Sequence, residues 1–328
     1  MQMNRNIWKA GLGLALISSF SLASCKERIM VQIDGSSTVY PITEAVAAAF
    51  QEKSGDVNVT VGVSGTGGGF KKFCSGKTDI SDASRVIKSD ELEKCEAAGI
   101  NFIEIPVAYD GLAVLVNPEN DFVDKLTVDE LKKIFNSESP AKTWAEVREG
   151  WPEEEIKAYS PGKDSGTFDY FIEAIIGKGG QVRSDALFSE DDNTLVRGIA
   201  GDKNGVGFFG FAYYEENKDS LKLVPIVNPR SGEAVQPSLE TVKKGTYSPL
   251  SRPLLIYVSE AGAKKDHVKK FVDFYLANVA ELSKQVGYIP LSAEAYENIK
   301  AHFENLETGS VLKDVDLMGK PVESLYAN

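Results

Sequence analysis

Short apolar runs along the chain predict strands. The segment Val57–Val63 alternates between hydrophobic and polar positions, as a strand with one buried face does. Runs rich in Leu and β-branched residues predict buried strands at four further places: Ile29–Ile33, Phe102–Val107, Leu112–Val116 and Leu254–Val258.

Between these strands, apolar residues recur with the period of a helix. The period predicts helices over residues 42–50, 168–176 and 268–275. Pro41 suits the first turn of the first helix, and Gly177 suits the end of the second. Because strands and helices alternate, we expect an α/β fold with mainly parallel sheets, in which ligands bind where strands end and helices begin.

Composition narrows the class of protein. The 328 residues are enough for two domains, and a hydrophobic content of 42% is ordinary for a globular protein. A formal net charge of −12 argues against binding to nucleic acids or to anionic membranes. The spacing of the histidines and cysteines matches no metal site, and we expect neither a metal nor a cofactor.

The N-terminus has the features of a secretion signal. Arg5 and Lys9 precede an apolar stretch over residues 10–20, which is too short to span a membrane. The following Leu22–Cys25 resembles the lipobox of bacterial lipoproteins, in which the cysteine is lipidated and becomes the new N-terminus. We therefore expect residues 1–24 to be a signal peptide and Cys25 to anchor the protein on the periplasmic or extracellular face of a membrane. The alternative is an ordinary signal peptide with a chance cysteine.

Two cysteines remain after this processing. In an oxidising compartment, Cys74 and Cys95 could form a disulfide that closes a short loop. Two buried free thiols are the alternative.

Three short polar stretches stand where helices should begin: Gly35–Thr38, Ser64–Gly69 and Lys163–Thr167. Each offers small hydroxyl side chains and backbone N–H groups at the positive end of a helix dipole, which is the chemistry of an oxyanion site. Because the net charge would repel an anion, such a site must act through local dipoles and one or two placed cations. A plain capping role is the alternative for each stretch.

The second stretch contains three consecutive glycines, which would allow close approach of the backbone to a ligand. A further segment, Asp79–Arg85, supplies the Ser84 hydroxyl and the Arg85 guanidinium, whose planar fork fits two phosphate oxygens. A surface ion pair is the alternative reading of Arg85.

Taken in order, these segments resemble the PstS-type phosphate-binding proteins, which are the extracytoplasmic receptors of bacterial phosphate ABC transporters. The resemblance covers most of the chain after the signal, from about residue 31 to 258. The matching segments are Asp34–Pro41, Ser64–Phe70, Asp79–Arg85, Val107–Gly111, Pro161–Phe171, Gly205–Phe211 and Pro249–Leu254.

The resemblance implies a two-lobed periplasmic-binding-protein fold of type II, in which each lobe is a mixed, mostly parallel sheet flanked by helices. The first lobe would comprise residues 29–108 with 254–328, and the second residues 109–253. Inorganic phosphate would be held in the cleft between them and delivered to the membrane permease of an ABC importer by a monomeric, non-enzymatic receptor. The phosphate-binding residues implied are Ser37, Thr38, Thr66, Gly67, Ser84, Arg85, Asp110, Ser165, Gly166 and Thr167.

The chain departs from the family pattern at two places. Pro161 stands where well-known members have an arginine, so Arg85, and next Lys163, would have to supply the cation. Ser84 stands where they have an aspartate, so Asp110, and next Asp82, would have to accept the proton of phosphate. Such an acceptor matters because sulfate has no proton to donate, and a buried carboxylate facing sulfate would stay unpaired.

Three other functions remain open from the sequence. The protein could be a receptor for another oxyanion, such as sulfate, molybdate or arsenate. It could be a secreted hydrolase of phosphate esters, although no histidine or cysteine lies near the serine motifs to activate a nucleophile. It could also be a surface sensor or adhesion protein that has kept the binding fold.

Overall fold

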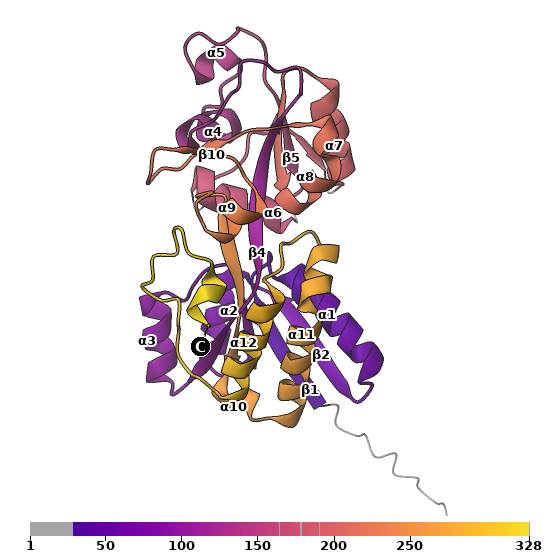
Figure 1. Ribbon diagram of the computed structural model, residues 1–328, viewed down its shortest axis with the longest axis vertical. Helices are drawn as coiled ribbons and strands as arrows, with labels where there is room; N and C mark the ends of the chain where they lie inside the picture. Colours follow the sequence, from indigo (N-terminus) through magenta and orange to yellow (C-terminus); the bar gives the residue numbers. More distant parts are fainter. Residues whose placement is uncertain (1–28, 164, 178, 190, 328) are drawn as a thin grey trace, which may run out of the picture.

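The computed structural model describes residues 29–163, 165–177, 179–189 and 191–327 (Figure 1). The predicted signal peptide and Cys25 lie outside the described residues. Within the described ranges, none of the helices combines the length and apolar character that a membrane crossing requires.

Two lobes lie one above the other in Figure 1, and one mixed sheet continues through both. Its strand order is β2-β1-β3-β11-β4-β7-β5-β6, with β8 beside β4. The strands are β1 (Ile29–Gly35), β2 (Val57–Val63), β3 (Ile80–Ala83), β4 (Phe102–Val116), β5 (Lys157–Pro161), β6 (Leu187–Ser189), β7 (Gly205–Gly210), β8 (Lys222–Leu223) and β11 (Ser251–Ser259). A separate small sheet pairs β9 (Ile226–Val227) with β10 (Ala234–Val235).

The long strand β4 joins the lobes. The sequence predicted two strands here, over Phe102–Val107 and Leu112–Val116, because the polar Asp110 interrupts the apolar run. The structure corrects this, since β4 is continuous. Its first part pairs antiparallel with β11 and its last part with β7, so extended pairing persists through Asp110 opposite Arg252.

The lower lobe contains β1, β2 and β3 together with helices from both the N-terminal and the C-terminal part of the chain (Figure 1). These helices are α1 (Tyr40–Lys53), α2 (Gly65–Phe73), α3 (Ser89–Ala97), α10 (Glu260–Ala263), α11 (Asp266–Gln285) and α12 (Ala293–Glu304). β1 is parallel to both β2 and β3, as the strand–helix alternation predicted. The structure joins Cys74 and Cys95 by a disulfide, with Cα atoms 4.3 Å apart.

The upper lobe contains β5, β6 and β7, which are parallel to one another. Its helices are α4 (Val128–Phe135), α5 (Trp144–Val147), α6 (Gly166–Phe171), the π-helical turn η1 (Ile172–Ile176), α7 (Asp192–Gly201) and α8 (Phe211–Asn217). The short helix α9 (Leu239–Lys243) contacts β4 and β11, the two strands that cross between the lobes. Gly177 ends the α6–η1 segment with a φ of +107°, as predicted.

The three polar stretches lie where the sequence placed them. Each stands where a strand, β1, β2 or β5, is followed by a helix, α1, α2 or α6; Gly35 is the last residue of β1, and Gly65–Gly69 and Gly166–Thr167 already belong to α2 and α6. Because β1 and β2 are parallel neighbours, their carboxyl ends bring the first two stretches to the same edge of the lower lobe.

Candidate functional site

A cavity of about 300 Å³ collects the predicted lower-lobe residues and opens between the two lobes. Its lining from the lower lobe is Ser36, Ser37, Thr38, Gly65, Thr66, Gly67, Ser84, Arg85 and Lys88. From the upper lobe and the crossing strand come Asp169, Tyr170, Ile172, Glu173, Gly179 and Arg252.

Ser36 organises the first stretch. Its Oγ accepts hydrogen bonds from the backbone N–H groups of Thr38, at 3.2 Å, and Val39, at 3.4 Å. From the sequence, Ser37 or Thr38 was the expected cap of this helix, but the N-cap residue of α1 is Val39, which makes no side-chain cap bond, and Ser36 holds the turn before the helix. Ser37 and Thr38 line the cavity, where the Ser37 hydroxyl donates to Asp169 and the Thr38 hydroxyl accepts from Arg252.

The glycines of the second stretch serve two purposes. A Cβ on Gly69 would lie 2.6 Å from Gly35 Cα and 2.9 Å from Asp34 O, so Gly69 is required for the packing of α2 on β1. Gly67 instead lines the cavity, and its added Cβ would meet nothing closer than 3.7 Å. The prediction that the glycines admit a ligand therefore applies to Gly67 and not to Gly69.

Thr66 and Ser84 form a pair of hydroxyls in the cavity wall. Their oxygens lie 3.1 Å apart, and Thr66 Oγ1 also accepts from the Ser84 backbone N–H at 3.2 Å. With the first-turn N–H groups of α2, which have no acceptor within the helix, these hydroxyls present hydrogen-bond donors to the cavity.

Arg85 reaches the cavity with its charge already compensated. Its two terminal nitrogens donate to the two oxygens of Glu91, each at 2.8 Å. Lys163, the second cation that the sequence suggested, is exposed, and its Nζ lies 6.0 Å from the centre of the Phe188 ring. Lys163 is not among the residues that line the cavity.

Arg252 is the central cation of the cavity, a role that the sequence did not assign. Its Nη2 donates to Thr38 Oγ1 at 2.8 Å, and its guanidinium carbon lies 3.5 Å from the centre of the Tyr170 ring. Only 12% of the Arg252 side chain is exposed.

The two carboxylates near Arg252 contact it more loosely than Glu91 contacts Arg85. Its Nε lies 3.3 Å from Asp110 Oδ2, and its Nη1 lies 3.6 Å from Glu173 Oε2. Both separations exceed the roughly 2.8 Å of a good charge-assisted hydrogen bond. A bound anion could therefore take over N–H donors of Arg252 more readily than those of Arg85, whose two terminal nitrogens are both held by Glu91.

The two candidate acceptors occupy different environments. Asp110 is buried beside Arg252; burial raises its pKa above the ordinary range, while the charge and hydrogen bond of Arg252 act in the opposite direction. Asp82 lies in the core of the lower lobe, where Thr43 is its neighbour but makes no hydrogen bond of good geometry with either carboxylate oxygen. Burial raises the pKa of Asp82 to about 8, with Thr43 acting in the opposite direction. Neither carboxylate is among the residues that line the cavity, but Asp110 contacts Arg252, which does line it, whereas Asp82 is enclosed in the core.

The third stretch brings the upper lobe into contact with the lower one. Ser165 Oγ accepts from the backbone N–H of Thr167 at 3.2 Å, while Gly166 lies against Thr38. A Cβ on Gly166 would lie only 2.7 Å from Thr38 Cα. None of Ser165, Gly166 and Thr167 lines the cavity, so the structure does not bring them together with Thr66 and Ser84.

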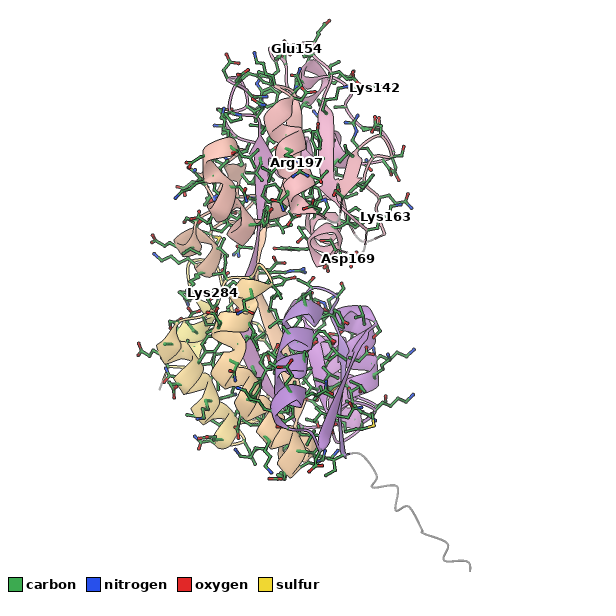
Figure 2. The ribbon with its side chains drawn as sticks, turned by 90° about the vertical axis from the view of Figure 1, so that its right-hand side faces the viewer. Lys142, Glu154, Lys163, Asp169, Arg197 and Lys284 are labelled. Carbon is green, nitrogen blue, oxygen red and sulfur yellow. A yellow bond between two sulfur atoms is a disulfide. The ribbon has the colours of Figure 1, made fainter. Side chains whose placement is uncertain are left out.

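Asp169 makes a second contact between the lobes. Its Oδ2 accepts from Ser37 Oγ at 2.9 Å. Figure 2 shows Asp169 on the side of the upper lobe that faces the lower lobe, with Lys163 farther out. Asp169, Tyr170 and Glu173 were missed because, from the sequence, they appeared only as positions within a predicted helix. The described residues contain no group of three His, Cys, Asp or Glu side chains that could hold a metal ion.

Comparisons with known proteins agree over most of the chain. A family model described as a PBP superfamily domain matches residues 23–279. The protein SphX of Synechococcus elongatus is 52% identical over 301 residues, which cover 91% of this chain and 88% of that protein. The phosphate-binding protein PstS of Staphylococcus saprophyticus is 40% identical over 287 residues, which cover 87% of this chain and 88% of that protein.

A solved structure is also similar. It is described as a possible phosphate binding protein from Planctomyces limnophilus and matches with a TM-score of 0.82 at 43% sequence identity. The match covers 84% of this chain and 98% of that one, so both lobes are included.

Proposed function

The chain belongs to the PstS-type phosphate-binding proteins of the PBP superfamily, and on this basis we propose that it captures inorganic phosphate in the cavity between its lobes and delivers it to an ABC-type phosphate importer. The observation that carries the proposal is Arg252, a largely buried cation with loosely held N–H donors beside a wall of hydroxyl groups.

Each part of the cavity has a role in this proposal. Arg252 supplies the positive charge that Pro161 does not, and its fork suits two oxygens of one phosphate. Thr66 and Ser84 donate hydrogen bonds from the lower lobe, with the N-terminal N–H groups of α2. Arg85, which is paired with Glu91, adds a weaker positive field at the edge of this wall.

In this proposal, a carboxylate that accepts the proton of phosphate selects phosphate over sulfate. Asp110 is the acceptor that we propose, because it is buried and lies directly against Arg252. A protonated phosphate oxygen can donate to such a carboxylate, whereas sulfate has no proton to offer near neutral pH. The unpaired, desolvated carboxylate would therefore disfavour sulfate by several kcal/mol.

Binding is coupled to closure of the lobes. We place the lobe boundaries at residues 29–108 with 254–328 and at 109–253, because β4 and β11 cross between the lobes near Tyr109 and Arg252. Closure brings Ser165–Thr167 toward the anion from the upper lobe, as the family pattern implies. Hinge closure around a ligand is a common motion of two-lobed binding proteins.

The setting that we propose is extracytoplasmic. Residues 1–24 would direct secretion, and lipidated Cys25 would hold a monomeric receptor at the membrane that carries the permease. The chain is a binding protein and not an enzyme, in line with its phosphate-binding relative. Capture and release require no bond to be made or broken.

The test is calorimetric titration of the secreted domain from Lys26 onward, after bound anion has been stripped. Phosphate should bind with micromolar or tighter affinity, and sulfate should give no binding heat. Equal binding of sulfate, molybdate or arsenate would favour a receptor for another oxyanion. Absence of phosphate binding would contradict the proposed function.

A further inference from the structure

The segment Ser310–Tyr326, which we name the C-terminal strap, leaves the lower lobe and returns to it. Both ends are fixed by Glu104, a fully buried carboxylate in β4. Near the start, Glu104 accepts from Ser310 Oγ at 2.5 Å and from the Leu312 N–H at 2.9 Å. At the end, it accepts from the Tyr326 hydroxyl at 3.0 Å.

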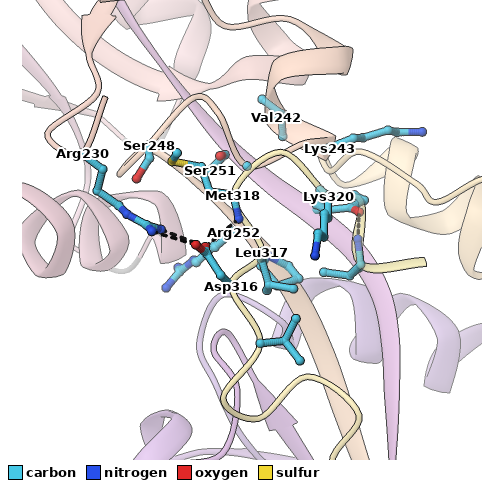
Figure 3. A pocket seen from close by; sticks show the side chains of 15 residues that line it. Arg230, Val242, Lys243, Ser248, Ser251, Arg252, Asp316, Leu317, Met318 and Lys320 are labelled. Carbon is cyan, nitrogen blue, oxygen red and sulfur yellow. Dashed lines mark hydrogen bonds and ion pairs between the residues drawn. The ribbon is translucent and has the colours of Figure 1, made fainter. Parts of the chain in front are cut away.

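Between these anchors the strap contacts the upper lobe. Asp316 forms two hydrogen bonds with Arg230, at 2.9 and 2.8 Å (Figure 3). The Gly319 N–H donates to the Lys244 carbonyl at 2.6 Å. Arg230 and Lys244 both belong to the part of the chain that we assign to the upper lobe, so the strap is a connection between the lobes in addition to β4 and β11.

The strap also holds the hinge itself. The hydroxyl of Tyr109, in β4, accepts from the Val322 N–H at 2.8 Å and donates to Glu323. Tyr109 directly precedes Asp110, the partner of Arg252. A contact made by the strap is therefore one residue away from the proposed phosphate site.

Leu312, Val322 and Tyr326 of the strap pack into the core, while the stretch between them borders a cavity. This cavity measures about 310 Å³, and its lining includes Arg230, Asp316, Lys320 and Tyr109 (Figure 3). It shares only Arg252 with the lining of the phosphate cavity. Because Arg230 and Asp316 are more than half exposed, their bonds can break without uncovering buried apolar side chains.

We propose that the C-terminal strap clamps the two lobes in the arrangement in which they touch, and so sets how readily the cleft opens and releases phosphate. The lobes touch in the structure through Gly166 on Thr38 and Asp169 on Ser37, and the strap bonds are present in the same arrangement. An interaction that exists only in one of two states shifts the population toward that state. The strap lies on the face of β4 and β11 opposite to the Asp110–Arg252 pair, so it ties the lobes together behind these strands and resists their relative rotation.

The proposal rests on the proposed function for its ligand, but not for its geometry. An exposed arginine–aspartate pair contributes little, so its loss should weaken phosphate binding by only about two- to fivefold, mainly through faster release. The effect is small, but its direction is specific, since neither residue lines the phosphate cavity.

The experiment compares Arg230→Gln, Asp316→Asn and the charge exchange of Arg230→Asp with Asp316→Arg. Arg197→Gln is the matched control, because Arg197 is also an exposed arginine, and it pairs with Asp191 inside the upper lobe. Phosphate affinity and release rate are measured by calorimetry and stopped flow, and thermal unfolding reports stability. X-ray scattering of the anion-free proteins reports lobe opening without any ligand.

We expect both single variants to release phosphate faster and to be more open in scattering, with unfolding temperatures close to that of the control. The charge exchange should restore slow release. Unchanged release and scattering in both variants, or an exchange that restores nothing, would overturn the clamp. If the wild-type protein binds no phosphate, the proposed function fails, and scattering alone decides whether the strap restrains opening.

Discussion

Replacing Arg252 by glutamine should weaken phosphate binding about 100-fold while leaving the hydroxyl groups of the cavity in place. Arg252 is largely buried, and its two carboxylate neighbours lie at 3.3 and 3.6 Å. A bound phosphate would take hydrogen bonds from this cation, each contributing about 1.5–3 kcal/mol. A loss of about 3 kcal/mol corresponds to roughly a 100-fold change in affinity.

The substitution also removes the cation beside Asp110. Without it, only burial would act on the Asp110 carboxyl, and its pKa would rise further. Part of any effect could then come from lower stability. Arg252→Lys separates the two effects, because lysine keeps the charge near Asp110 but loses the planar fork. It should bind phosphate about tenfold more weakly than wild type, with little loss of stability.

The assay is calorimetric titration with phosphate, with thermal unfolding of each variant recorded alongside. Arg85→Gln is the comparison, because the charge of Arg85 is already neutralised by Glu91. We expect the loss of affinity to be smaller for Arg85→Gln than for Arg252→Gln. The reasoning would be refuted if Arg252→Gln bound phosphate within about threefold of wild type, or if Arg85→Gln were the more damaging change.

Three further predictions follow from the described contacts. Gly166→Ala should weaken phosphate binding by blocking contact of the lobes, whereas Gly201→Ala, whose new Cβ would meet nothing within 4 Å, should bind normally in the same titration. Burial raises the pKa of Asp82 from its ordinary 3.8 to about 8 in the folded protein, so its contribution makes the protein less stable as pH rises from 5 to 8. Asp82→Asn should remove a slope of roughly 1.4 kcal/mol per pH unit in urea unfolding, and an unchanged slope would contradict this. Reducing the Cys74–Cys95 disulfide should lower the free energy of unfolding by about 3 kcal/mol for its loop, and no change in the urea midpoint would show that this loop closure does not stabilise the fold.

Much of the fold follows from local patterns in the sequence. The alternation of Val57–Val63 and the helical period after Pro41 reflect burial of one face, which depends only on nearby residues. The continuity of β4 could not be predicted in this way. Asp110 looks like a break in an apolar strand until Arg252, which is 142 residues away, is known to pair with it across the sheet.

In the site, too, some features follow from the local sequence and others depend on contacts between distant residues. Thr38 and Thr66 could be identified because helix starts with small hydroxyl residues are visible in sequence, and Ser84 because its segment resembles one of the family. The choice between Arg85 and Arg252 as the main cation depends on which carboxylates surround each guanidinium, and that is set by tertiary contacts. The burial of Asp82 in the core likewise depends on the direction in which β3 presents alternate side chains, which a four-residue strand does not reveal from its sequence.

The most direct measurement of the central claim is a crystal structure of the anion-stripped protein grown with phosphate. The account predicts one phosphate in the cavity between the lobes, with oxygens within hydrogen-bond distance of the Arg252 guanidinium and of the Thr66 and Ser84 hydroxyls, and one oxygen facing Asp110. A phosphate bound elsewhere, or a cavity that stays free of anion at saturating phosphate, would contradict it.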